Sequence, residues 1–164
     1  MDKFELSFDM VKSAPRAPGI RVQVIGDDGF CRSYISAYNE LGAEAAVGRP
    51  LMLSYDKLTG DEMVAPATTG SEVYVYTGVP TRPVPDKELD WFQIGGPCKG
   101  LVDGTADVTA GDALEVLNAG VAFIKAGSAR DLSTAALASV AQAANSAVLV
   151  DIMLIPERHS IEAA

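Results

Sequence analysis

The chain has 164 residues, of which 48% are hydrophobic and 21% charged, with a formal net charge of −9. This length predicts one globular domain that folds without disulfides, so Cys31 and Cys98 are expected to be free thiols. The acidic balance disfavours nucleic acid as a partner, and no stretch is apolar enough to predict a membrane span or a signal peptide.

The N-terminal part predicts an arm followed by a hairpin. Residues 1–19 include an Ala-Pro-Arg-Ala-Pro-Gly sequence, which favours an extended arm. Residues 20–25 alternate apolar and polar side chains as a half-buried strand does. Gly-Asp-Asp-Gly at 26–29 then predicts a hairpin turn into a strand over residues 30–38.

The next stretch predicts short elements and a stiff connection. A short helix is tolerated over residues 39–48, although Gly42 opposes it. Prolines lack a backbone donor, so Pro80, Pro83 and Pro85 predict an extended connection outside any central strand. Further extended segments are expected over residues 50–55, 62–67 and 73–76.

The second half predicts regularly spaced short strands. They are expected over residues 91–94, 100–102, 113–117 and 121–124. Turns containing glycine separate them, including one at residues 95–97. This spacing indicates a barrel or sandwich. The alanine-rich residues 132–144 also tolerate a helix, but we favour a strand that pairs with residues 147–155.

Together these patterns predict an all-β chain with a small barrel or sandwich core of β-tulip type, an extended N-terminal arm and little helix. The chain divides into an arm (1–19), a β-rich N-terminal part with the proline-rich connection (20–89), a β core (90–156) and a polar tail (157–164).

Candidate catalytic residues are few. His159 is the single histidine, with Glu157, Ser160 and Asp151 nearby, but it follows the last predicted strand, where no pocket is expected to hold it against a nucleophile. Cys98 has no histidine near it in the sequence and is expected to be inert. We therefore predict no enzymatic activity.

Candidate ligand sites are equally weak. The glycines around Cys98 lack the spacing of a phosphate-binding loop and predict a turn between strands. Asp103, Asp107 and Asp112 do not have the spacing of a calcium loop, and the pairs Asp103-Gly104 and Gly111-Asp112 predict turns. No cofactor or metal site is predicted.

The segment from 91 to 156 resembles the head decoration, or capsid cement, proteins of tailed bacteriophages. The residues that carry the resemblance are 94–97, 102–104, 108–114, 118–120, the alanine-rich run to 144, and 148–156. Its most telling piece is Ala-Gly-Asp-x-Leu at 110–114, followed by a short hairpin, an alanine-rich strand and a final Val/Leu-rich strand.

The resemblance implies a β-rich structural protein without enzymatic activity. Such a protein is made in the host bacterial cytoplasm and sits on the outer surface of the icosahedral head. It binds there as homotrimers at three-fold and quasi-three-fold positions and clamps the major capsid protein after the shell expands. The N-terminal part, residues 1–89, is longer than in the smallest decoration proteins.

Two groups of residues receive roles in this hypothesis. The expected capsid contacts are Phe4, Leu6, Phe8, Pro15, Arg16, Pro18, Pro80, Pro83 and Pro85. The expected core and trimer interface consists of Trp91, Phe92, Val148, Val150, Ile152 and Leu154.

An alternative is a virion-surface module for receptor or glycan adhesion. In this reading the tyrosines at 34, 38, 74 and 76 form an adhesive face.

Overall fold

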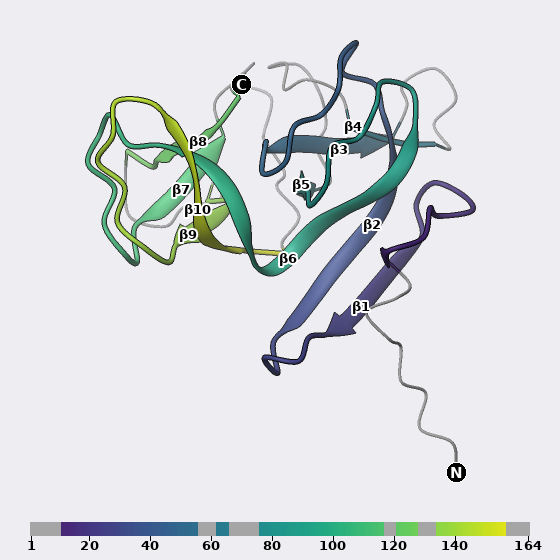
Figure 1. Ribbon diagram of the computed structural model, residues 1–164, viewed down its shortest axis with the longest axis horizontal. Coiled ribbons are helices and arrows are strands. Elements are labelled where there is room, and N and C mark those ends of the chain that lie inside the picture. The colour runs from purple at the N-terminus through teal and green to yellow at the C-terminus, as the bar shows by residue number, and fades with distance from the viewer. Residues whose placement is uncertain (1–10, 56–61, 66–75, 117–120, 128–133, 157–164) are drawn as a thin grey trace.

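A computed structural model of the chain describes residues 11–55, 62–65, 76–116, 121–127 and 134–156. In these ranges ten strands join into one continuous sheet, which confirms the all-β fold (Figure 1). The strands are β1 (Arg21–Ile25), β2 (Cys31–Asn39), β3 (Leu51–Tyr55), β4 (Met63–Ala65), β5 (Tyr76–Pro80), β6 (Leu89–Asp103), β7 (Ala113–Val116), β8 (Phe123–Lys125), β9 (Ala136–Ala138) and β10 (Ala147–Leu154). No helix long and apolar enough to cross a bilayer occurs in the described ranges.

The first barrel is a closed ring of five strands. Its order is β2, β4, β3, β5 and the first half of β6, and β6 returns to pair with β2. A ring this small leaves room only for side chains, so its interior is a packed core rather than a pore. The largest of the fully buried side chains inside it are Ile35, Leu51, Leu53, Met63, Phe92 and Ile94.

The second barrel is another closed ring of five strands. It runs from the second half of β6 through β10, β9, β7 and β8 back to β6. Its core contains Val102, Leu114, Phe123, Ile152 and Leu154, with Ala135, Ala136 and Ala138. In both rings one neighbouring pair is parallel, β2–β4 in the first and β6–β8 in the second. An odd number of strands requires this, because alternating directions cannot close on themselves.

Strand β6 belongs to both barrels and passes from one to the other (Figure 1). The expected turn at residues 95–97 is therefore wrong: the chain bends there and continues as strand. Gly96 has a φ of 86°, and a Cβ at this position would lie 2.3 Å from the carbonyl oxygen of Cys31, so only glycine fits. Glycine and proline here bend the strand instead of reversing it.

Pro97 is accommodated within the ladder by its register. It lies opposite Met153 of β10. The carbonyl of Asp151 accepts a bond from the amide of Ser139, on the β9 side, so odd-numbered residues of β10 direct their backbone groups away from β6. Pro97 therefore occupies a position where no backbone donor is needed.

A loop around Gly48 ties the barrels together. Its amide donates to the carbonyl of Pro80 at 3.0 Å, and its carbonyl accepts from the amide of Leu101 at 2.9 Å. The Val79 side chain, from β5, packs in the core of the second barrel. The two rings therefore share both backbone and side-chain contacts.

The hairpin of β1 and β2 forms as expected around residues 26–29, and it projects from the first barrel (Figure 1). Beneath it, Val24, Tyr34 and Trp91 form a third apolar cluster, against which Val11 and Val22 pack. Residues 11–19 of the expected arm lie against this region, because Trp91 donates to the carbonyl of Ser13 and the hydroxyl of Ser36 donates to that of Ala17. Residues 1–10 lie outside the described part.

Two local expectations are wrong. Asn39 ends β2, and residues 40–48 form turns and a single bridge between Ala45 and Val84 instead of the expected helix over 39–48, because Gly42 and Gly48 have φ values of 76° and 75°, outside the helical region. Pro80 lies in a strand, β5, between β3 and β6. It is tolerated because it is the last residue of that strand.

The C-terminal strand pairing is confirmed. β9 pairs with β10 in antiparallel register, as favoured for the alanine-rich segment and residues 147–155. The expected boundary between residues 89 and 90 falls inside β6, which begins at Leu89.

Candidate functional site: a cleft where the barrels meet

An open cleft of about 620 Å³ lies beside the bend of β6. Several distant segments line it: the N-terminal residues, the hairpin, the loop after β5, the bend itself and β10. The lining residues are Val11, Lys12, Asp28, Arg32, Tyr34, Val47, Thr81, Arg82, Gln93, Pro97, Cys98, Lys99 and Asp151. It brings together charged side chains from segments that are far apart in the sequence.

Arg82 forms one wall of the cleft. Its guanidinium makes a two-pronged pair with the largely buried carboxylate of Asp90, with nitrogen–oxygen distances of 2.8 and 2.5 Å. A further nitrogen donates to the carbonyl of Lys12 at 2.9 Å. The hydrogen bonds to Asp90 raise the pKa of Arg82, so this cation is permanent and fixed in place.

Arg32 also lines the cleft. It pairs with Asp28 through two hydrogen bonds and donates from Nε to the carbonyl of Pro97 at 3.2 Å. The hydrogen bond from Arg32 is the main reason that the pKa of Asp28 falls to about 2. These bonds hold the hairpin against the bend of β6.

The floor of the cleft is polar but internally satisfied. Gln93 is buried, and its amide nitrogen donates to the carbonyls of Gly95 and Pro97 at 3.1 and 2.9 Å. Burial raises the pKa of the Cys98 thiol to about 12, so it stays protonated at neutral pH and is a poor nucleophile. At the rim, Lys99 pairs with Asp151 at 2.7 Å, and both side chains are exposed.

The cations of the cleft are paired within the molecule. Each of three cations, Arg32, Arg82 and Lys99, is held by a carboxylate. Positive and negative charges therefore lie side by side on an open surface, a pattern that orients a surface of complementary charge.

Two segments expected to contact a capsid meet at this cleft. The bond from Arg82 to Lys12 brings residues 11–13 beside the loop that follows β5. Of the predicted contacts, Pro15 and Pro18 are half-buried, Arg16, Pro83 and Pro85 are exposed, and Pro80 is buried. Phe4, Leu6 and Phe8 lie outside the described residues.

The residues expected in the core or trimer interface separate into three places. Phe92 lies inside the first barrel and Trp91 beneath the hairpin. Ile152 and Leu154 lie inside the second barrel, with Val150 partly packed against them. Val148, by contrast, is 40% exposed.

The remaining sequence candidates are dispersed. Asp103 accepts hydrogen bonds from Thr105, and Asp112 accepts two from Thr109, as expected of turn residues. In the described ranges no cluster of three potential metal ligands forms. Glu157, His159 and Ser160 lie outside these ranges.

The four tyrosines do not form one adhesive face, and that expectation is wrong. Tyr34 is buried in the cluster beneath the hairpin, whereas Tyr76 is buried inside the first barrel. Tyr38 is half-buried, and Tyr74 lies outside the described residues. The side chains of Tyr34 and Tyr76 lie on opposite sides of the barrel wall, because they pack in different apolar clusters.

Sequence reasoning missed the residues that shape the cleft. Arg32 and Pro97 are 65 positions apart, and Arg82 and Lys12 are 70 apart. The one available signal was local, since Arg82 lies among the prolines and eight residues before Asp90.

Comparison with known proteins gives a likeness to solved structures. No protein-family model matches the chain, and neither does any curated protein. A solved structure, the head fiber gp8.5 N base in bacteriophage phi29, aligns with 85% of this chain and 98% of its own, with 14% identity and a TM-score of 0.49. A likeness of this degree assigns neither function nor partner.

Proposed function

We propose that the chain is a structural protein of a tailed-phage virion that binds the outer surface of the icosahedral capsid. In this proposal it acts as homotrimers at three-fold and quasi-three-fold positions. Its partner is the major capsid protein, and it stabilises the expanded shell against the pressure of packaged DNA. It has no enzymatic role.

The observation that carries the proposal is the correspondence between the resemblance and one unit of the fold. The described residues of the segment that resembles decoration proteins, from 91 to 156, include every strand of the second barrel. Its most telling piece, residues 110–114, forms the turn closed by Asp112 and the start of β7. If the resemblance were a chance match of glycine-rich turns, we would not expect its residues to coincide with a complete barrel.

The cleft supports a capsid-facing role for the junction of the barrels. It is open, it carries fixed charges of both signs, and it gathers parts of two segments already expected to contact the shell. Rim charges of this kind set the orientation of binding more than its strength. We place the capsid contact there.

Exposed apolar side chains on the second barrel support a contact between copies. Val140, Val148 and Leu149 are 39%, 40% and 41% exposed, and all three belong to β10 or to the loop after β9. In the proposal Val148 keeps its predicted role in the trimer contact, whereas Leu149, the next residue of β10, points to the opposite face of the strand. Trimerisation multiplies weak capsid contacts through effective concentration.

The stabilising effect follows from mass action. A protein that binds the expanded shell better than the unexpanded one shifts the equilibrium toward the expanded form. Many copies per shell add these contributions, so each single contact needs only modest affinity.

The test is co-sedimentation of the purified chain with heads that lack it, in expanded and unexpanded forms. We expect stoichiometric binding to expanded heads alone. Lys99→Glu, which reverses a charge at the cleft rim, should weaken binding about tenfold or more, because like charges then oppose the site's partner. Lys87→Glu is the matched control: Lys87 is likewise exposed and paired, with Glu40, but does not line the cleft.

Two results would contradict the proposal. Absence of binding to either form of head would remove the capsid role, and saturable binding to host cells or glycans would then favour adhesion. If Lys99→Glu and Lys87→Glu weaken head binding equally, the capsid contact does not lie at the cleft.

A further inference from the structure

Strand β1 leaves one backbone edge unpaired. In the described part of the chain it pairs with β2 alone, whereas the other nine strands belong to the two closed rings. Closed rings have no free edges along their paired lengths, and an unpaired edge is a site where another strand adds. This edge plays no part in the cleft.

The hydrogen-bond pattern shows which groups face outward. Gly26 donates to the carbonyl of Phe30, and Ser36 donates to that of Ile20, both at 2.9 Å. In an antiparallel pair such positions alternate, so the even-numbered residues of β1 bond to β2. Arg21, Gln23 and Ile25 therefore direct their amide and carbonyl groups away from β2.

The edge is complementary to a second copy of itself. If two β1 strands pair in antiparallel register about Gln23, Arg21 of one copy lies opposite Ile25 of the other, and Asp27 of that copy follows in the turn just beyond the strand. Arg21 and Asp27 are exposed, and neither forms an ion pair within the described residues. A cation and a carboxylate at the two ends of one strand edge match those of the reversed copy.

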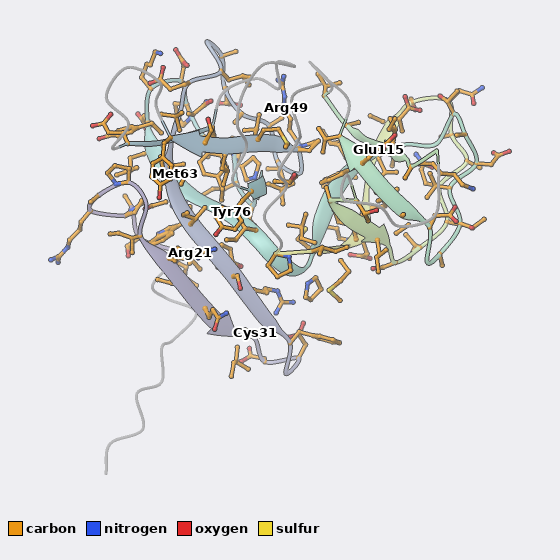
Figure 2. The ribbon with its side chains drawn as sticks, turned by 180° about the vertical axis from the view of Figure 1, so that it is seen from behind. Arg21, Cys31, Arg49, Met63, Tyr76 and Glu115 are labelled. Carbon is orange, nitrogen blue, oxygen red and sulfur yellow. The ribbon has the colours of Figure 1, made fainter. Side chains whose placement is uncertain are left out.

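The tip of the hairpin adds apolar surface next to this edge. Ile25 is 71% exposed and Phe30 is 52% exposed. The central carbon of the Arg21 guanidinium lies 4.4 Å from the centre of the Tyr76 ring, so the side chain extends from β1 toward the first barrel (Figure 2). Antiparallel pairing would place this stem against Ile25 of the other copy, which shields the apolar side chain.

We propose that two copies of this chain pair through their β1 edges, with Gln23 at the two-fold axis. The pairing joins two hairpins into a four-stranded sheet through about six main-chain hydrogen bonds, two for each outward-facing residue pair. Contact between the copies does not depend on capsid binding. Its role as a link between neighbouring trimers on a shell rests on the proposed function.

The first test measures association of the full chain by sedimentation equilibrium over a wide concentration range. We expect the particle mass at least to double with concentration: a monomer has one β1 edge and forms a dimer, whereas a trimer has three edges and associates further. Gln23→Pro removes an outward donor that the β1–β2 ladder does not use, and it should weaken the association at least tenfold. Gln23→Thr, which keeps the donor, is the control and should still associate.

The second test reads the edge directly by hydrogen exchange. The amides of Arg21, Gln23 and Ile25 should gain protection as concentration rises, whereas those of Val22 and Val24 should be protected throughout. Protection of Val22 and Val24 in Gln23→Pro also shows that the variant is folded.

Three outcomes overturn the pairing: no doubling of mass, doubling that Gln23→Pro leaves unchanged, or protection of Arg21 and Gln23 that does not depend on concentration. The last would mean that the same chain covers its own edge. Failure of the β1 pairing can be distinguished from failure of the proposed function. Gln23→Pro should bind heads at saturating concentration as well as the unaltered chain does, whether or not the β1 edges pair.

Discussion

The two barrels have the same number of strands and share one, yet they are closed and filled differently. The first closes through two parallel residue pairs between β2 and β4, and its core contains two aromatic rings, Tyr76 and Phe92, beside three alanines. The second closes through a single pair, Val102 with Phe123, and its core contains one aromatic ring, that of Phe123, also beside three alanines. Because so few backbone pairs close the second barrel, its stability depends more on the side chains packed inside it.

Close approach of the backbone at one glycine brings two large side chains together in the second barrel. At Gly100, an added Cβ would lie 2.4 Å from Cδ1 of Ile152 and 3.1 Å from the ring of Phe123. Large side chains thus fill the space that alanine and glycine leave across the barrel. The comparison teaches that the same topology is closed and filled with different sets of large side chains.

The largest expected effect comes from breaking the strand that the rings share. Gly96→Ala should destabilise the protein by more than about 4 kcal/mol, because the new Cβ meets the carbonyl of Cys31 at a positive φ. Gly111→Ala is the control: its φ is 90° and nothing lies within 4 Å of the added Cβ, so about 1–2 kcal/mol is expected. Urea unfolding measures both. Equal losses would mean that the close approach is unimportant.

Emptying each core separately compares the rings directly. Phe92→Ala and Phe123→Ala remove fully buried phenyl groups from the first and second barrels. Each should lower the free energy of unfolding by about 3–5 kcal/mol. Because β6 belongs to both, we expect a single unfolding transition in either variant. Hydrogen exchange should show β8 amides opening first in Phe123→Ala, since one residue pair holds that strand to β6. Two separate transitions would contradict the joint unit.

Overfilling tests the dependence on small residues. Ala136→Leu enlarges a fully buried side chain in the second barrel and should cost about 1–3 kcal/mol. The exposed Ala143 offers the control, since Ala143→Leu should change stability by less than about 0.5 kcal/mol. Urea midpoints for the two variants provide the measurement. A neutral Ala136→Leu would show that the second core has spare room.

The smallest effect is electrostatic. The pKa values of Asp28, in the hairpin, and Asp112, in a turn of the second barrel, fall from 3.8 to about 2. A lowered folded pKa stabilises the protein above the ordinary value, and this contribution is lost as the pH falls toward 2. Asp28→Asn and Asp112→Asn should each flatten the decline of the urea midpoint between pH 3.8 and 2. An unchanged slope in both variants would contradict the assignment.

Local patterns in the sequence predicted the elements whose causes are local. The β1–β2 hairpin follows from Gly-Asp-Asp-Gly at 26–29, and the last strand pair from apolar residues around 147–155. The turn roles of Asp103 and Asp112 also follow from neighbours within three positions. In each case the deciding contacts lie close along the chain.

The rest depended on contacts that a local pattern does not contain. Glycine and proline at residues 95–97 are compatible with a turn and with a bent strand. The bend prevails because Cys31 approaches Gly96 and Met153 pairs with Pro97. The cleft was hidden for the same reason, since Arg32 reaches it from the hairpin and Arg82 from the loop after β5.

Strand β6 also has a mechanical consequence. It is one uninterrupted piece of backbone that crosses both barrels and is paired on both flanks, with β2 and β5 in one and β10 and β8 in the other. A load that pulls the barrels apart along this strand acts on covalent bonds, and its ladder hydrogen bonds are strained together in shear instead of opening one by one. The junction is thereby built to carry tension.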